Sequence, residues 1–226
     1  MKLWIVGVGP GDPRLLTVHA VEVLRRVELA FAPLMGSELE SRAYQVACPY
    51  LSPGCAVVYL SLEDPHASRR VVEALASRKP KEAAFLVLGD PGLYGSPFRI
   101  LPEVAGGIPL EVEVIPGISA HQVMSARLLL PLAQGGEILS IVPGTAEKER
   151  IGTLLANSDT CVVYKVASLF RRVALDFGDS FEGWIGENLA TEKEKIYPLA
   201  NCSLSLPYFS LAFLRRRKSP YLLQSL

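Results

Sequence analysis

Short apolar runs recur along the first half of the chain, and stretches with apolar residues at helical spacing separate them. The run Leu3–Val8 is the first, and the stretch after it keeps a helical period of apolar residues from Leu15 to Leu24. Strands that alternate with helices in this way are typical of an α/β fold with a largely parallel sheet. The strands predicted for this half are 3–8, 28–33, 56–62, 83–89 and 110–115.

A second series of elements begins after Pro116-Gly117 and ends differently from the first. Its last apolar runs follow one another without room for long helices, which favours antiparallel pairing near the end of the chain. We therefore predict two α/β domains, 1–116 with a mainly parallel sheet and 117–226 with a mixed sheet. The elements predicted for the second domain are helices near 119–130, 146–157 and 168–177 and strands at 138–144, 160–166, 182–188, 194–204 and 208–216.

Composition narrows the function classes. The chain has 226 residues, 50% of them hydrophobic, which suffices for one sizeable domain or two small ones. Its 23 basic side chains balance its 23 acidic ones, which argues against a nucleic-acid partner, because phosphate binding requires clustered Lys and Arg. The one dense basic cluster, 215–218, is interpreted as a solvated tail after the last strand.

The cysteines indicate the compartment. They lie far apart, without a C-x-x-C pair or nearby histidines, so we expect no metal site and buried thiols in a reducing environment. The first apolar run is too short for a signal peptide, and no run is long enough to span a bilayer. The sequence thus predicts a soluble cytoplasmic protein without a membrane partner. The cysteines are Cys48, Cys55, Cys161 and Cys202.

The first apolar run leads into a loop with the sequence GVGPGDP, residues 7–13. A dinucleotide fingerprint would place a third glycine where Asp12 stands, and Pro10 and Pro13 lack the N–H groups that bind a pyrophosphate. Asp12 is a good helix N-cap and Pro13 suits the first helical position, so these two residues predict the start of a helix. The remaining segment, 9–11, favours a close backbone approach to a ligand or to another loop.

Two further loops follow strands of the same half. Residues 88–98 contain Gly89-Asp90-Pro91 directly after a buried strand, and in 113–122 Pro116-Gly117 breaks a strand before Ser119, which can cap the next helix. In open α/β sheets, ligands bind outside the carboxyl ends of the strands, so these loops predict one cleft. Capped turns without a ligand are the alternative.

Together, the three loops resemble those of the tetrapyrrole (corrin/porphyrin) methylase family, and the resemblance covers nearly the whole chain. It implies two αβα domains with a cleft between them, S-adenosylmethionine bound folded in that cleft, and a homodimer. The segments that carry it are Val6–Pro13 with Leu15–Thr17, Gly89–Pro91 and Ile115–Ser119.

Within the family, the chain looks most like the precorrin-2 or cobalt-factor II C(20)-methyltransferases. This implies methylation of a meso carbon, C-20, of a tetrapyrrole in cobalamin biosynthesis. Residues 92–95 also resemble a loop of the precorrin-6 methylases. The segments that support the C(20) group are Ala32–Pro33, Ser37–Glu38, Ser41–Tyr44, Leu130–Ala133 and Pro207–Leu211.

The resemblance also implies site residues. The acetate and propionate groups of a tetrapyrrole call for basic partners, for which Arg14, Arg99 and Lys165 are the candidates. Asp90 is interpreted as both structural and directed at the cofactor. The cofactor contacts carried over are Pro10, Leu88, Gly89, Asp90, Leu93, Ser119, Ala120, Tyr164, Ala190, Phe209 and Ser210.

The catalytic group is not identified by the sequence. Methyl transfer from a sulfonium to an enamine-like ring carbon needs alignment more than covalent catalysis, so the lack of a Cys-His or Ser-His pair is no objection. His121 is a candidate base, with a satisfied core histidine as the alternative, and His19 and His66 have weaker claims.

Other functions stay open at this point. A different tetrapyrrole methylase, of the precorrin-6 type or acting on uroporphyrinogen III, would share the same loops. The related diphthine synthases would be expected to lack residues 9–12 as they stand here. A nucleotide-sensing α/β domain without catalysis would fail to bind S-adenosylhomocysteine.

Overall fold

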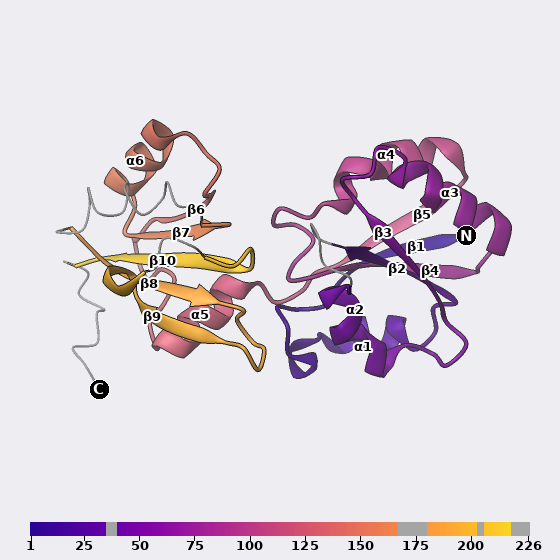
Figure 1. Ribbon diagram of the computed structural model, residues 1–226, viewed down its shortest axis with the longest axis horizontal. Coiled ribbons are helices and arrows are strands. Elements are labelled where there is room, and N and C mark those ends of the chain that lie inside the picture. Colours follow the sequence, from indigo (N-terminus) through magenta and orange to yellow (C-terminus); the bar gives the residue numbers. More distant parts are fainter. Residues whose placement is uncertain (35–39, 167–179, 203–205, 218–226) are drawn as a thin grey trace. The chain divides into compact units, whose positions relative to one another are not determined.

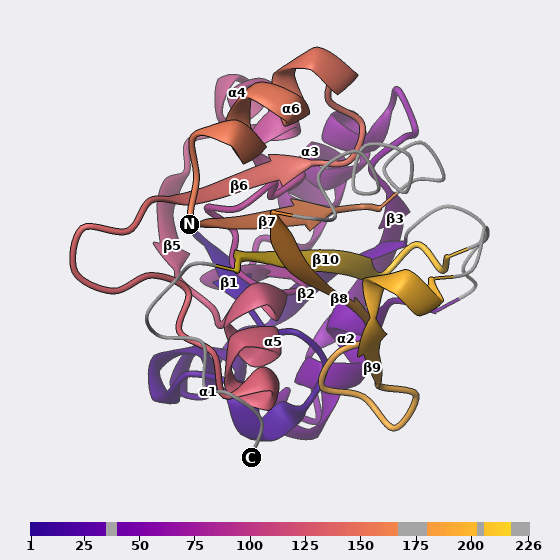
Figure 2. The same cartoon turned by 90° about the vertical axis from the view of Figure 1, so that its left-hand side faces the viewer.

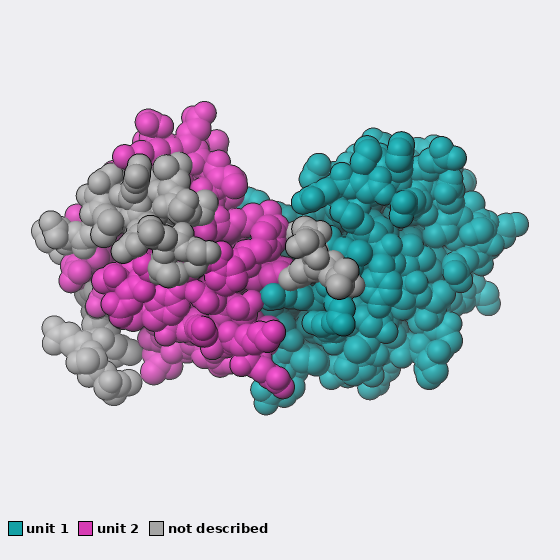
Figure 3. Space-filling view, viewed as in Figure 1, with its two compact units in different colours: residues 1–119 teal, residues 120–226 magenta. Residues whose placement is uncertain are grey.

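The computed structural model describes residues 1–34, 40–166, 180–202 and 206–217. The chain divides into two compact units, residues 1–119 and 120–226 (Figure 3), and each is described by itself. The predicted domain boundary at 116–117 and the predicted cleft stay predictions. The helix predicted at 168–177, the Ser37–Glu38 segment, the end of the predicted strand 194–204 and Lys218 lie outside the described residues.

The first unit contains a five-stranded sheet with the order β3-β2-β4-β1-β5, and every strand pair in it is parallel. This confirms the parallel sheet predicted from the apolar runs. Its elements, in chain order, are β1 (Lys2–Gly7), η1 (Pro13–Leu15), α1 (Val18–Leu24), β2 (Leu29–Leu34), α2 (Arg42–Ala47), η2 (Cys48–Tyr50), β3 (Ala56–Ser61), α3 (Ala67–Arg78), β4 (Glu82–Val87), α4 (Pro97–Gly107) and β5 (Glu111–Ile115).

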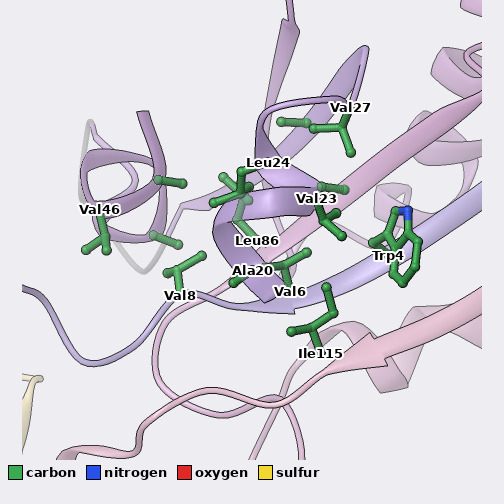
Figure 4. Packing of buried hydrophobic residues seen from close by; sticks show 14 of the residues in the cluster. Trp4, Val6, Val8, Ala20, Val23, Leu24, Val27, Val46, Leu86 and Ile115 are labelled. Carbon is green, nitrogen blue, oxygen red and sulfur yellow. The ribbon is translucent and has the colours of Figure 1, made fainter. Parts of the chain in front are cut away.

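Helices cover both faces of this sheet (Figure 1). Because successive side chains of a strand point to opposite faces, Trp4 and Val6 of β1 join a buried cluster with α1 and α2, whereas Leu3 and Ile5 join one with α3 and α4. Figure 4 shows Val6 close to Ala20 in the first of these clusters. The unit therefore has three layers, helix–sheet–helix.

The second unit contains a mixed sheet with the order β6-β7-β10-β8-β9. Strands β6 and β7 are parallel, and the other pairs are antiparallel, as predicted. Its described elements, in chain order, are α5 (Ala120–Leu128), β6 (Leu139–Pro143), α6 (Lys148–Ala156), β7 (Thr160–Tyr164), β8 (Phe181–Glu187), β9 (Lys195–Pro198), η3 (Leu199–Asn201) and β10 (Ser210–Arg216).

Helices α6 and α5 lie on opposite sides of these strands (Figures 1 and 2). Ile151 and Leu155 of α6 pack in one buried cluster with Val163 and Ala212. On the other side, a Cβ added to Gly186 of β8 would meet Met124 Sδ of α5 at 2.8 Å. The glycine therefore lets α5 approach the sheet closely.

In the described part of the basic cluster, residues 215–217, the prediction of a solvated tail is wrong for Arg215 and Arg216, which are buried and partly buried, whereas Arg217 is exposed. Arg215 is fully buried in β10, and its guanidinium pairs with Glu137. Arg216 donates to backbone carbonyls at the end of α6, including Leu155 O at 3.0 Å. Arg217 Nε donates to Phe181 O. β10 extends into this cluster and ends at Arg216. The contacts of Arg216 and Arg217 therefore link the end of β10 to the segment after α6 and to Phe181 of β8.

The prediction of buried thiols is confirmed for Cys161 and Cys202 and wrong for Cys48, and this contrast gives a first testable prediction. Cys48 is exposed, whereas Cys161 is buried and its burial raises the pKa of the thiol to about 12. Iodoacetamide at pH 8 should alkylate Cys48 and spare Cys161 in the folded protein, because the thiolate is the reactive form. Peptide mass spectrometry measures this, with urea-unfolded protein as the control in which both react. Equal labelling rates in the folded protein would contradict it.

Candidate functional site

Three loops leave the carboxyl ends of neighbouring strands in the first sheet. The register pairs Gly7 of β1 with Val87 of β4, and Val6 with Ile115 of β5. Because β4, β1 and β5 are adjacent and parallel, the segments that follow them emerge side by side at one edge. These segments are 8–13, 88–96 and 116–119.

The three loops touch through backbone atoms. Gly9 N donates to Gly89 O at 3.3 Å, and Gly89 N donates to Gly9 O at 2.7 Å. Both residues have left-handed backbones, with φ of 76° and 79°. A Cβ on Gly117 would lie 2.2 Å from Gly89 O and 2.9 Å from Gly7 Cα, so a side chain there has no room. The close approach predicted for 9–11 is thus made to another loop.

Asp90 ties two of these loops together. Its Oδ1 accepts a hydrogen bond from Gly92 N at 2.7 Å, and its Oδ2 accepts one from Gly117 N at 2.9 Å. Both carboxylate oxygens therefore hold backbone amides. The structural part of the interpretation of Asp90 agrees with these contacts, and its direct contact with a cofactor stays a prediction.

Replacing Asp90 by Asn should lower the free energy of unfolding by about 1–2 kcal/mol, because an amide nitrogen in place of one oxygen leaves a backbone N–H without its acceptor. Urea unfolding measures the change. Asp64→Asn is the matched control, since Asp64 makes the same turn contact, to His66 N, but pairs with Arg70 at the surface. Equal stability of the two variants would contradict the assigned role of Asp90.

The helix start predicted at Asp12 needs a correction. Asp12 caps only the short turn η1, by accepting a hydrogen bond from Arg14 N at 2.9 Å. The chain is extended again at Leu16, so α1 begins at Val18, and its cap is Thr17, whose Oγ1 accepts from Ala20 N. Arg14, predicted to bind substrate, pairs with Asp12 through Nη2 at 2.7 Å and is 88% exposed.

The other predicted contacts of the first unit differ in exposure. Pro10 and Ser119 are buried, whereas Leu88, Gly89 and Leu93 are partly exposed. Gly89 faces open space, since a Cβ there would meet nothing within 4 Å. This combination of a left-handed residue and free space is typical of a backbone that admits a ligand. Arg99 lies exposed in the first turn of α4.

The second unit brings its predicted contacts to one edge of the mixed sheet. Tyr164 ends β7 and pairs with Leu211, next to Ser210 at the start of β10. Ser210 in turn pairs with Glu187 at the end of β8, and Phe209 O accepts from Asn188 N at 2.9 Å. The edge thus gathers the predicted residues Tyr164, Lys165, Ala190, Phe209 and Ser210.

Backbone strain concentrates in the same segments. Among the described non-glycine residues, six have positive φ, and four of them lie in the segments discussed above. Such conformations cost free energy and cluster at functional sites. The four residues are Tyr94, Lys165, Asn188 and Ala190.

An ion pair that the sequence does not reveal supports the strained turn after β8. Glu194 Oε2 accepts from Ala190 N at 2.6 Å, and its Oε1 accepts from Arg127 Nε of α5 at 2.8 Å. The pair thus links α5 to the turn that carries Ala190. No signal in the sequence distinguishes Glu194 or Arg127 from ordinary surface charges.

His121 is buried, with 8% of its surface exposed, and its Nδ1 lies 2.8 Å from Tyr164 Oη. This contact fits the alternative of a satisfied histidine better than that of a free base. His19 packs edge-on against Trp4, and His66 is exposed before α3. Lys165 is exposed, with Nζ 5.6 Å from the centre of the Tyr208 ring.

The described part of the chain contains no cluster of three or more His, Cys, Asp or Glu side chains placed to hold a metal ion. None of its helices combines the length and apolar character that crossing a membrane requires.

Comparison with known proteins gives relatives along the whole chain. Cobalamin biosynthesis protein CobIJ of Mycobacterium tuberculosis is 31% identical over 95% of this chain but only 46% of its own length, so the chain spans about half of that relative. Precorrin-2 C(20)-methyltransferase of a Sinorhizobium species is 30% identical, with 91% of each protein covered.

A solved structure shares the fold. Uroporphyrin-III C-methyl transferase of Thermus thermophilus, in complex with S-adenyl homocysteine, superposes with a TM-score of 0.71. The match covers 95% of this chain and 92% of that one at 22% identity. The family model of the Tetrapyrrole (Corrin/Porphyrin) Methylases matches residues 2–201. The chain therefore belongs to the tetrapyrrole (corrin/porphyrin) methylases.

Proposed function

We propose that the protein is an S-adenosylmethionine-dependent methyltransferase that methylates C-20 of precorrin-2 or cobalt-factor II in cobalamin biosynthesis. The observation that carries the proposal is the 30% identity to a precorrin-2 C(20)-methyltransferase over 91% of both proteins. The glycine-rich edge of the first sheet supports it, because its loops match the family's segments.

The residues at the two sheet edges fit such a methyl donor. Gly89 leaves open space beside a left-handed backbone, and the partly exposed Leu88 and Leu93 offer apolar contact for an adenosyl group. Ala120 begins α5, and the partial positive charge at the start of a helix favours a nearby carboxylate. The proposed cofactor contacts are Pro10, Leu88, Gly89, Asp90, Leu93, Ser119, Ala120, Tyr164, Ala190, Phe209 and Ser210.

Among the basic residues, Arg99 and Lys165 are the stronger candidates for the substrate carboxylates. Both are exposed, and Lys165 lies at the edge that carries Tyr164. Arg14 is the weaker one, because its guanidinium already pairs with Asp12. Exposed guanidinium and ammonium groups suit carboxylates through charge-assisted hydrogen bonds.

Methyl transfer of this kind needs no covalent intermediate between the protein and the substrate. S-adenosylmethionine supplies a methyl group on an activated sulfonium, so a carbon–carbon bond forms as the carbon–sulfur bond breaks. The ring carbon then loses a proton to solvent or to a base that we do not assign. Residues of the site hold the reactants in line and exclude water.

The decisive experiment incubates the full chain and S-adenosylmethionine with precorrin-2, cobalt-factor II and uroporphyrinogen III separately, and reads products by mass. One added methyl on precorrin-2 or cobalt-factor II supports the proposal. Methylation of uroporphyrinogen III alone, or of no tetrapyrrole, contradicts it. Asp90→Asn is the matched variant and should lower turnover of every accepted substrate to the same extent.

The proposal also includes the location, the oligomeric state and the domain boundary of the protein. A cytoplasmic enzyme that acts as a homodimer, with domains divided at 116–117, fits the family. Calorimetry against S-adenosylhomocysteine tests the non-catalytic alternative, because a domain without methyl transfer would not bind it.

A further inference from the structure

Tyr164 is paired with a strand on each side, and its hydroxyl contacts the first turn of α5. As the last residue of β7, it pairs with Pro143 of β6 on one side and with Leu211 of β10 on the other. Its hydroxyl oxygen accepts a hydrogen bond from His121 N at 3.2 Å and lies 2.8 Å from His121 Nδ1. One phenolic oxygen thus bonds both the backbone and the imidazole of the same residue.

The contact between the Tyr164 hydroxyl and His121 lies at the N-terminal end of α5. The N–H groups of a first helical turn have no acceptor within the helix, and His121 is the second residue of α5. The other end of α5 has its own support, through Arg127 and its partner Glu194. Tyr164 therefore anchors the end of α5 that directly follows Ser119 and begins with Ala120.

We propose that the hydroxyl of Tyr164 has a positioning role for the methyl donor, separate from the direct contact that the proposed function gives this residue. Its hydroxyl holds the first turn of α5 against the end of β7 through His121, and this sets Ser119 and Ala120 for donor binding. The inference rests on the proposed function, which assigns Ser119 and Ala120 to the cofactor. Because the hydroxyl acts through the helix, its loss weakens donor binding more than it slows the chemical step.

The main test compares Tyr164→Phe with Tyr197→Phe. Tyr197 is another tyrosine of the same sheet, and its hydroxyl bonds Glu187 rather than α5. For Tyr164→Phe we expect the Kd for S-adenosylhomocysteine and the KM for S-adenosylmethionine to rise about tenfold, with kcat changed less than about twofold. Tyr197→Phe should leave all three constants at the wild-type values.

A second pair of measurements separates positioning from direct contact. Hydrogen exchange in the protein without ligand should become faster at residues 120–123 in Tyr164→Phe and stay unchanged there in Tyr197→Phe. His121→Phe, which keeps the backbone bond, should weaken binding less than Tyr164→Phe. The double variant should bind no worse than Tyr164→Phe alone, because both bonds share one phenolic oxygen.

Each outcome decides one of the two proposals. If the wild-type protein fails to bind S-adenosylhomocysteine, the proposed function is wrong. If it binds and Tyr164→Phe binds equally well, only the positioning role is wrong. Weaker binding with unchanged exchange at 120–123, or additive losses in the double variant, would also overturn that role. Should Tyr164→Phe not fold, His121→Phe still supplies the test, and wild-type affinity and exchange in that variant would overturn the role.

Discussion

Replacing Gly117 by Ala is expected to lower the free energy of unfolding of the first unit by about 3 kcal/mol, the upper part of the usual range for overpacking. The new Cβ would lie 2.2 Å from Gly89 O and 2.9 Å from Gly7 C. These are backbone atoms of a neighbouring loop and of the end of β1, so no side chain can rotate away to make room. A fall of roughly 10 °C in the melting temperature follows from that loss.

Gly106→Ala is the matched control for this prediction. Gly106 lies inside α4, and a Cβ there would meet nothing within 4 Å. Since alanine favours helix over glycine, this variant should gain about 0.5–1 kcal/mol. Calorimetric unfolding of both variants measures the contrast. A Gly117→Ala protein as stable as Gly106→Ala would show that the three loops do not need their close backbone contact.

Replacing Arg215 by Met is the second large effect, with an expected loss of about 3–5 kcal/mol, because it leaves the Glu137 carboxylate without its buried partner. The Arg215 side chain is 0% exposed and that of Glu137 is 11% exposed. The same guanidinium also donates to Pro131 O, Leu132 O and Thr160 Oγ1, so several acceptors lose their donor at once. Urea unfolding measures the loss.

Two controls accompany Arg215→Met. The double variant with Glu137→Leu should recover part of the loss, since it removes the charge that the single variant deprives of its guanidinium partner. Arg69→Met, which breaks an exposed pair with Glu73 within α3, should cost less than about 1 kcal/mol. If Arg215→Met cost no more than Arg69→Met, Arg215 would not be the buried anchor of β10.

The apolar pattern predicts both sheets because most of their strands bury apolar side chains that the sequence shows directly. The run Leu3–Val8 overlaps β1 (Lys2–Gly7). The closing run at 208–216 contains β10, which pairs antiparallel with β7 and β8. The sequence does not reveal the role of Arg215, because a basic residue after an apolar run is typical of a solvated tail. Its partner Glu137 lies 78 residues earlier in the chain, and only the folded sheet brings the two together.

The candidate site was predictable at the level of loops and less so at the level of contacts. Glycine and proline at strand ends mark 7–13, 88–95 and 116–117, because only a few residues suit such turns. The sequence does not reveal that Asp90 spans two loops, nor that Glu194 supports Ala190. The Asp90 contact depends on how distant strands are aligned, whereas the Glu194 contact depends on the conformation of a local turn. The residue roles in cofactor and substrate binding stay predictions.

The position of β1 has a consequence for how the chain acquires its fold. Both neighbours of this first strand come much later in the sequence, with Lys2 opposite Glu82 of β4 and Glu111 of β5. During synthesis, the apolar β1 therefore has no strand to pair with until β4 has left the ribosome, and it stays half-paired until β5 follows. Pairings between residues this far apart in the sequence slow folding. They also prolong the exposure of apolar surface and of unpaired strand edges, which favours aggregation. We expect refolding of the first unit to be slow and to depend on chaperones at high protein concentration.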